Sequence, residues 1–184
     1  MAAEQVMRRL LVGLLVVAAL VWAGRGWLRP GRAPLPLATA ADSTGAGVRS
    51  ARLYFASPSG DSLVVEPREM VESAGLHDRV AALVAELDRG PRAGGIAALP
   101  AGTSVLHAFM DERGLLTLDL SRSFRQGFHG GAGAEYLALA SLVRTLGANL
   151  PGVRRVLIVC GGEPLPTLGG HLPLDRPLEV ADWP

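Results

Sequence analysis

The sequence predicts an α+β fold in which two helices pack on one face of a small mixed β-sheet, preceded by an N-terminal transmembrane helix. Three observations support this prediction. Short apolar segments are separated by turns rich in Gly and Pro. Two longer segments repeat apolar residues with the 3.6-residue period of an amphipathic helix. An unbroken apolar run lies near the N-terminus. The elements of the domain therefore follow the order strand, strand, helix, strand, strand, helix, strand.

The first half of the domain is predicted to hold two strands and one helix. Residues 48–56 alternate apolar and basic side chains, and residues 62–65 form a second strand that stops at Pro67. The helix spans residues 77–89, because its apolar residues recur at i, i+3, i+4 and i+7. Gly90-Pro91 ends it, since glycine adopts the left-handed conformation readily and proline cannot continue a helix.

The second half of the domain is predicted to hold a hairpin, a second helix and a final strand. The hairpin joins residues 103–110 to residues 115–120, and residues 161–184 are irregular. The helix spans residues 134–149 and carries an apolar stripe: Tyr136, Leu139, Ala140, Val143, Leu146 and Leu150. Residues 153–160 are nearly continuously apolar, as in a strand buried on both faces. The crossover through the helix is expected to place this strand parallel to a hairpin strand.

The N-terminal residues are predicted to hold the domain at a membrane. A helix over residues 10–28 would be about 28 Å long, close to the roughly 30 Å thickness of the hydrocarbon core. A cleaved signal peptide is the alternative, because the uninterrupted apolar part ends at Ala23. Residues 1–28 are therefore interpreted as a signal-anchor. Residues 29–47, rich in Pro, Gly and Ala, are interpreted as a linker to a domain at residues 48–184.

Charge and cysteine content exclude several classes of function. Residues 48–184 carry thirteen Arg against fifteen acids, a net charge of −2, so a nucleic-acid binder is not expected. The sequence has no Lys, which excludes a P-loop lysine and a Schiff-base lysine. Cys160 is the single cysteine, which excludes an intramolecular disulfide and a multi-cysteine zinc site.

Few residues form a pattern typical of catalysis or ligand binding. His129 lies in a Gly-rich loop whose amides suit an anion, but the loop lacks a P-loop pattern, and backbone flexibility explains its glycines. Asp119, Ser121 and His171 are the residue types of a hydrolytic triad, without a G-x-S-x-G motif. Asp119 and Ser121 are expected to bond the backbone at a turn instead. A metal site would need four residues whose spacing matches no zinc pattern: His129, Cys160, Glu163 and His171.

The other polar candidates are predicted to have structural or solvated roles. His107 is expected to be half-buried, Cys160 to be an inert buried thiol, and Arg154-Arg155 to form a solvated strand end. Three acids are expected in a loop, without converging as glycosidase carboxylates: Glu66, Glu69 and Glu72. The sequence therefore predicts no catalytic, cofactor-binding or metal-binding residue, no cofactor and no enzymatic activity.

An ordered series of blocks gives the chain a resemblance to a known family. The blocks are residues 48–55, 63–65, Gly90-Pro91, 99–103, 105–110, 114–121, Phe124, Gly130-Gly131, Glu135, 151–153, 156–159, 169–171 and Pro177-Leu178. They extend over about residues 48–180, and in their order the chain resembles the GerMN domain, the sporulation and spore-germination domain of bacterial envelope proteins. The founding germination protein carries two such domains, whereas this chain carries one.

The resemblance implies a non-enzymatic, membrane-tethered interaction or assembly module of the bacterial cell envelope, linked to sporulation or spore germination. It places the chain in the cytoplasmic membrane, in a single pass through residues 10–28, with the domain facing the periplasm or cell wall. The expected partners are envelope proteins or copies of the chain, bound through an exposed apolar patch or a free sheet edge. The alternative is a peptidoglycan-binding or peptidoglycan-processing accessory, which requires a groove with aromatic residues or converging acids. A small-molecule or metal-binding enzyme would require His129, His171 and Cys160 to cluster.

Overall fold

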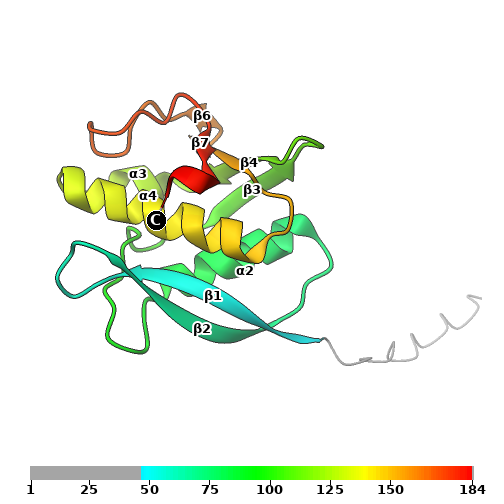
Figure 1. Ribbon diagram of the computed structural model, residues 1–184. Coiled ribbons are helices and arrows are strands. Elements are labelled where there is room, and N and C mark those ends of the chain that lie inside the picture. Colours follow the sequence, from blue (N-terminus) through cyan, green and yellow to red (C-terminus); the bar gives the residue numbers. More distant parts are fainter. Residues whose placement is uncertain (1–46, 184) are drawn as a thin grey trace, which may run out of the picture. The chain divides into compact units, whose positions relative to one another are not determined.

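The computed structural model describes residues 47–183 (Figure 1). The predicted transmembrane helix, within residues 1–28, and the predicted linker up to residue 46 lie outside the described residues. Among the helices of residues 47–183, none is long and apolar enough to cross a membrane.

The strands form two sheets, so the prediction of one mixed sheet is wrong, although the α+β class and the order of the main elements are confirmed. An antiparallel hairpin stands alone and consists of β1 (Val48–Ala56) and β2 (Leu63–Val71). The second sheet has the order β3 (Val105–Met110), β4 (Leu115–Leu120), β5 (Arg155–Cys160) and β6 (Glu163–Pro164), and β7 (Leu178–Glu179) also pairs with β5. The crossover prediction is confirmed, because β5 runs parallel to β4.

The helices are α2 (Leu76–Asp88), the short α3 (Arg122–Gln126), α4 (Ala132–Asn149) and a 3-10 turn, η1 (Val180–Asp182). In Figure 1, α4 lies between the β1–β2 hairpin and the sheet that holds β3 and β4. Both sheets contribute to one hydrophobic core with α2 and α4. The physical reason for the second sheet is that α4 is buried all round, over every residue from 137 to 143, and such a helix needs cover on both sides.

Polar side chains of α4 close one edge of β1. Asn149 accepts a hydrogen bond from the Arg52 amide at 2.9 Å and donates to the Arg52 carbonyl at 2.8 Å. Thr145 accepts from the Tyr54 amide at 3.1 Å, and Ser141 donates to the Tyr54 carbonyl at 2.5 Å. These three helix residues, four apart, take the place of a neighbouring strand, so β1 has partners on both edges.

The strand predicted to stop at Pro67 instead continues to Val71. Pro67 lies opposite Arg52, whose amide and carbonyl bond to α4 rather than to β2. The backbone of Pro67 therefore faces away from β1, where its missing N–H breaks no ladder bond. Glu66 and Glu69 consequently lie in a strand and not in the predicted loop.

Two predictions about burial are also wrong. Only one face of β5 is buried, because Leu157 and Val159 on its other face remain half-exposed. Tyr136 lies on the predicted apolar stripe of α4 but is exposed. Residues 161–183 are less irregular than predicted, since β6, β7 and η1 form there.

Candidate functional site

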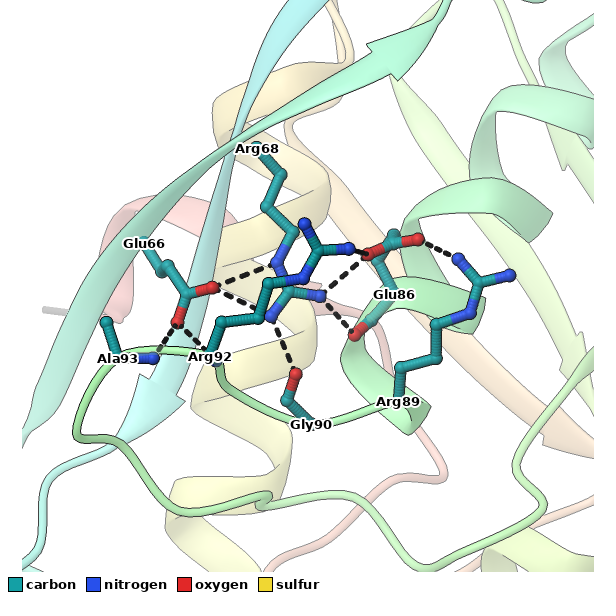
Figure 2. A network of polar contacts seen from close by, with 7 residues as sticks. All are labelled: Glu66, Arg68, Glu86, Arg89, Gly90, Arg92 and Ala93. Atoms are coloured by element: carbon teal, nitrogen blue, oxygen red, sulfur yellow. Dashed lines mark hydrogen bonds and ion pairs between the residues drawn. The ribbon is translucent and has the colours of Figure 1, made fainter.

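A buried arginine joins β2, α2 and the loop after α2 (Figure 2). Arg68 donates from Nε and Nη2 to Oε1 of Glu66, at 2.9 and 2.8 Å. Its Nη1 donates to Oε2 of Glu86 at 2.6 Å and to the Glu86 carbonyl at 3.3 Å, and Nη2 donates to the Gly90 carbonyl at 2.7 Å. All five N–H groups of the guanidinium therefore have acceptors.

The two acids of this network have further donors. Arg89 pairs with Glu86, and Nη2 of Arg92 lies 3.5 Å from Oε2 of Glu86. Glu66 accepts the amides of Arg92 and Ala93 at 2.9 and 3.1 Å. Burial by itself raises the pKa of Glu86, but the hydrogen bond from Arg68 and the charges of Arg89 and Arg68 outweigh it, so this pKa lies below its ordinary value. The network satisfies its own groups and acts as a structural clamp.

A second buried acid holds the loop after β6. Glu135, in the first turn of α4, is fully buried. Its Oε1 accepts the amides of Leu168 and Gly169 at 3.1 and 2.9 Å, and its Oε2 accepts the amide and Nδ1 of His171 at 2.9 and 3.0 Å. Burial raises the pKa of Glu135, but the backbone bonds from Gly169 and His171 outweigh it and lower the pKa below its ordinary value.

The structure does not bring the candidate triad residues together. Asp119 accepts the amide of Gly162 at 3.0 Å, and Ser121 donates to the Gly102 carbonyl at 3.2 Å. His171 instead contacts Glu135. The predicted bonding of Asp119 and Ser121 to the backbone is confirmed, although it reaches segments distant in the sequence rather than a local turn.

The candidate metal ligands also have separate surroundings. Cys160 is buried, as predicted, and faces Glu163 across the β5–β6 pair. His129 is exposed in its loop, and His171 belongs to the Glu135 clamp. Between residues 47 and 183, no three His, Cys, Asp or Glu side chains are grouped so as to hold a metal ion.

Two predictions for exposed polar residues have different outcomes. His107 is exposed on β3, so the prediction that it is half-buried is wrong. Arg154 is exposed before β5, as expected of a solvated strand end, and Nε of Arg155 lies 4.0 Å from Glu179.

Exposed apolar side chains form two cross-strand pairs, one near each end of the outer face of the hairpin, with the exposed Ser50, Arg52, Pro67 and Glu69 between them. The strand register places Val48 opposite Val71 and Tyr54 opposite Val65. Val48, Val71 and Val65 are 67%, 65% and 55% exposed. We call these four residues the hairpin surface. It is a candidate for docking rather than chemistry, because apolar side chains left in water favour a partner that covers them.

Sequence reasoning missed most of these features. The sequence pattern ends the strand at Pro67 and so places Arg68 outside it, and Glu135 is singled out only by the family resemblance. A usable signal for Glu135 was an acid in the first turn of a helix that follows a Gly-rich loop, where it is favoured by the helix dipole. The hairpin surface depends on the register of β1 with β2, for which the sequence offered no direct signal.

Comparison with known proteins gives one family match and several structural matches. A family model described as Germane, sporulation and spore germination, matches residues 52–166. A crystal structure of a candidate lipoprotein from Clostridium perfringens is 22% identical, with a TM-score of 0.52 over 74% of this chain and 90% of that chain. The tandem GerMN domains of the sporulation protein GerM from Bacillus subtilis are 19% identical, with a TM-score of 0.59 over 73% of this chain and 47% of that chain. The first GerMN domain of GerM alone is 19% identical, with a TM-score of 0.58 over 71% of this chain and 97% of that chain. No curated protein matches.

Proposed function

Because this chain belongs to the Germane family of sporulation and spore germination, we propose that it is a non-enzymatic interaction and assembly module of the bacterial cell envelope. In this proposal, residues 1–28 anchor it in the cytoplasmic membrane in a single pass, residues 29–47 are a linker, and residues 48–184 work outside the cytoplasm. The description of the Clostridium perfringens structure as a candidate lipoprotein supports membrane attachment. The partners are envelope proteins or further copies of the chain.

The observation that carries this proposal is the hairpin surface. Three of its side chains are valines that lie mostly in water, on the face of the hairpin opposite the buried Ala51, Leu53 and Phe55. Burying one fully exposed valine contributes about 1.5 kcal/mol. The three valines are 55–67% exposed, so covering them contributes about 3 kcal/mol. This value lies below the cost of association, so a stable complex needs further contacts around the hairpin surface.

The free edge of β2 is a less suitable contact than its face. Pro67 lies in the middle of this strand and offers no N–H to an added strand. Proline on an edge strand is a common device against edge-to-edge pairing. The partner is therefore expected to lie across the hairpin surface rather than to extend the hairpin.

The buried polar groups support binding rather than catalysis as the role of the domain. Arg68 and Glu135 are buried and charged, as catalytic groups often are. The hydrogen bonds of both residues, however, are made to other segments of the domain, which they hold in place.

The experiment compares two exposed apolar positions in the tagged full-length protein, purified from its own cell envelope in mild detergent. Val65→Glu changes the hairpin surface, and Phe109→Glu is the control, because Phe109 is an exposed apolar residue of the other sheet. We expect the wild type and Phe109→Glu to retain a stoichiometric envelope partner or a series of self-oligomers, and Val65→Glu to lose it. A monomeric wild type without partner, or equal retention by both variants, would refute the proposal.

A further inference from the structure

A groove near the C-terminal end of the described chain is built on a stacked aromatic pair. Tyr136 of α4 and Trp183, which follows η1, have ring centroids 5.2 Å apart and planes inclined by 28°. Tyr136 is 38% exposed, whereas Trp183 is 8% exposed. Trp183 therefore supports Tyr136 from within the domain, and Tyr136 presents aromatic surface to the groove that both residues line.

The support of this aromatic pair is fixed to α4. Nη1 of Arg144 donates to the Trp183 carbonyl at 3.1 Å. At Gly147, a Cβ atom would lie 2.4 Å from Cγ1 of Val180, so only glycine lets η1 approach the helix this closely. Because these contacts hold the segment before binding, little conformational entropy is left to lose when a ligand stacks on Tyr136.

The rest of the groove carries charges of both signs. Its lining includes Arg176, Glu179 and Asp182. Among the described residues, neither Arg176 nor Asp182 belongs to an ion pair, and Glu179 has only the 4.0 Å approach of Arg155. The groove has a volume of about 540 Å³, within the range of small-ligand sites, roughly 300–1,000 Å³.

This combination selects a ligand with a flat apolar face, hydroxyl groups and ionised groups of both signs. An aromatic face is electron-rich and attracts the polarised C–H groups on one side of a pyranose ring. A guanidinium binds carboxylates through paired hydrogen bonds. Carboxylates accept hydrogen bonds from hydroxyl and ammonium groups. A saccharide joined to a short peptide that has free carboxylates and an amino group meets all three requirements.

We propose that this groove binds peptidoglycan, with a sugar ring against Tyr136, a stem-peptide carboxylate at Arg176, and hydroxyl or ammonium groups at Glu179 and Asp182. The inference depends on the proposed function only for the location of the domain outside the cytoplasm. From the sequence, peptidoglycan binding is the alternative function and requires a groove with aromatic residues, of which the chain has few, 5% of its residues. The fold answers that objection by bringing together two aromatic residues that are 47 positions apart in the sequence.

A proline-rich peptide is the competing occupant, because aromatic-lined grooves also bind extended proline segments. Such a peptide would use Tyr136 but has no general need for a cation and two carboxylates in the same groove. The free charges therefore favour peptidoglycan.

The test is co-sedimentation of the detergent-solubilised full-length protein with purified sacculi. Arg176→Gln removes the proposed carboxylate contact, and Arg113→Gln is its control, an exposed arginine in the β3–β4 turn. Loss of one charge-assisted contact should weaken binding about tenfold for Arg176→Gln, with no change for Arg113→Gln. Tyr136→Leu keeps an apolar side chain over Trp183 and should also weaken binding.

Two results would overturn the proposal: failure of the wild type to sediment with sacculi, or equal sedimentation of the Arg176→Gln and Arg113→Gln variants. Soluble muropeptide should compete with sacculi for the protein, whereas competition by a proline-rich peptide alone would assign the groove to the other occupant and refute the inference. Val65→Glu should still sediment with sacculi, and Arg176→Gln should still retain the envelope partner. These two results distinguish a failure of the groove proposal from a failure of the proposal for the hairpin surface.

Discussion

Replacing Arg68 by methionine should destabilise the domain by about 3–5 kcal/mol. Methionine keeps an unbranched apolar chain near Phe55, whose ring centroid lies 5.3 Å from the guanidinium carbon of Arg68. The change removes the buried cation and all its hydrogen bonds, so Glu66 and the Gly90 carbonyl lose a partner. Removing one member of a buried ion pair costs about 3–5 kcal/mol, because the other member stays desolvated. A domain of this size has an unfolding free energy of about 5–15 kcal/mol, so the loss is a large share of it.

Thermal unfolding of the full-length protein in mild detergent, followed by far-UV circular dichroism, measures this effect. At about 3 °C per kcal/mol, the midpoint should fall by about 10 °C. Arg92→Met is the control, because Arg92 is an exposed partner of Glu86 at 3.5 Å, and exposed pairs contribute about 1 kcal/mol or less. Equal small shifts for the two variants would show that burial does not give Arg68 its importance, and would refute the reasoning.

Three further predictions concern other buried or edge positions. Glu135→Gln should cost about 2 kcal/mol at pH 7, since an amide nitrogen would face N–H donors of the loop. Because the folded-state pKa of Glu135 is lowered, its contribution is present above the unfolded pKa near 4.5 and is lost as the pH falls through the folded value, so the two proteins should converge in acid in urea titrations. Asn149→Ala should speed amide exchange at Arg52 but not at Leu53, which faces β2; equal exchange would contradict the edge contact. Pro67→Val restores an N–H on the open edge, and should cause concentration-dependent association in sedimentation velocity, which the wild-type edge resists.

The elements that the sequence predicted well are those set by local pattern. The strand Leu115–Leu120 and the amphipathic stripe of α2 are both read from residues close together in the chain. Gly90 has a φ of +82°, as its predicted place at the helix end requires. The parallel pairing of β4 with β5 follows from the general rule for crossover connections. Local patterning and chain connectivity therefore specify most of the elements and their order.

The separate hairpin escaped prediction because its cause lies in another element. Ser141, Thr145 and Asn149 occur every four residues on an apolar helix, and together they form the partner of the β1 edge. This spacing was visible in the sequence, but a polar row on a helix is usually a solvated face. Only the burial of all three residues identifies them as hydrogen-bond partners of a strand.

The candidate sites are harder still to predict from the sequence, because they join residues that are far apart in the chain. Arg68 and Glu86 are separated by 18 positions, and Tyr136 and Trp183 by 47. No periodicity connects such pairs, and composition argued against an aromatic groove. The chemistry of these sites is therefore a property of the tertiary structure, and Arg68 and Trp183 also lie in segments where the sequence predicts no strand or helix.

The two proposed binding surfaces are physically connected through Arg144 of α4. Its guanidinium carbon lies 5.2 Å from the centroid of the Tyr54 ring, which belongs to the hairpin surface. The same guanidinium donates to the carbonyl of Trp183, which supports Tyr136 in the groove. Because its contacts already hold the Trp183 segment in the free domain, Arg144 supports both surfaces before either ligand binds. A module that contacts both the wall and an envelope protein would gain from this arrangement, because little conformational entropy is left to lose at either surface.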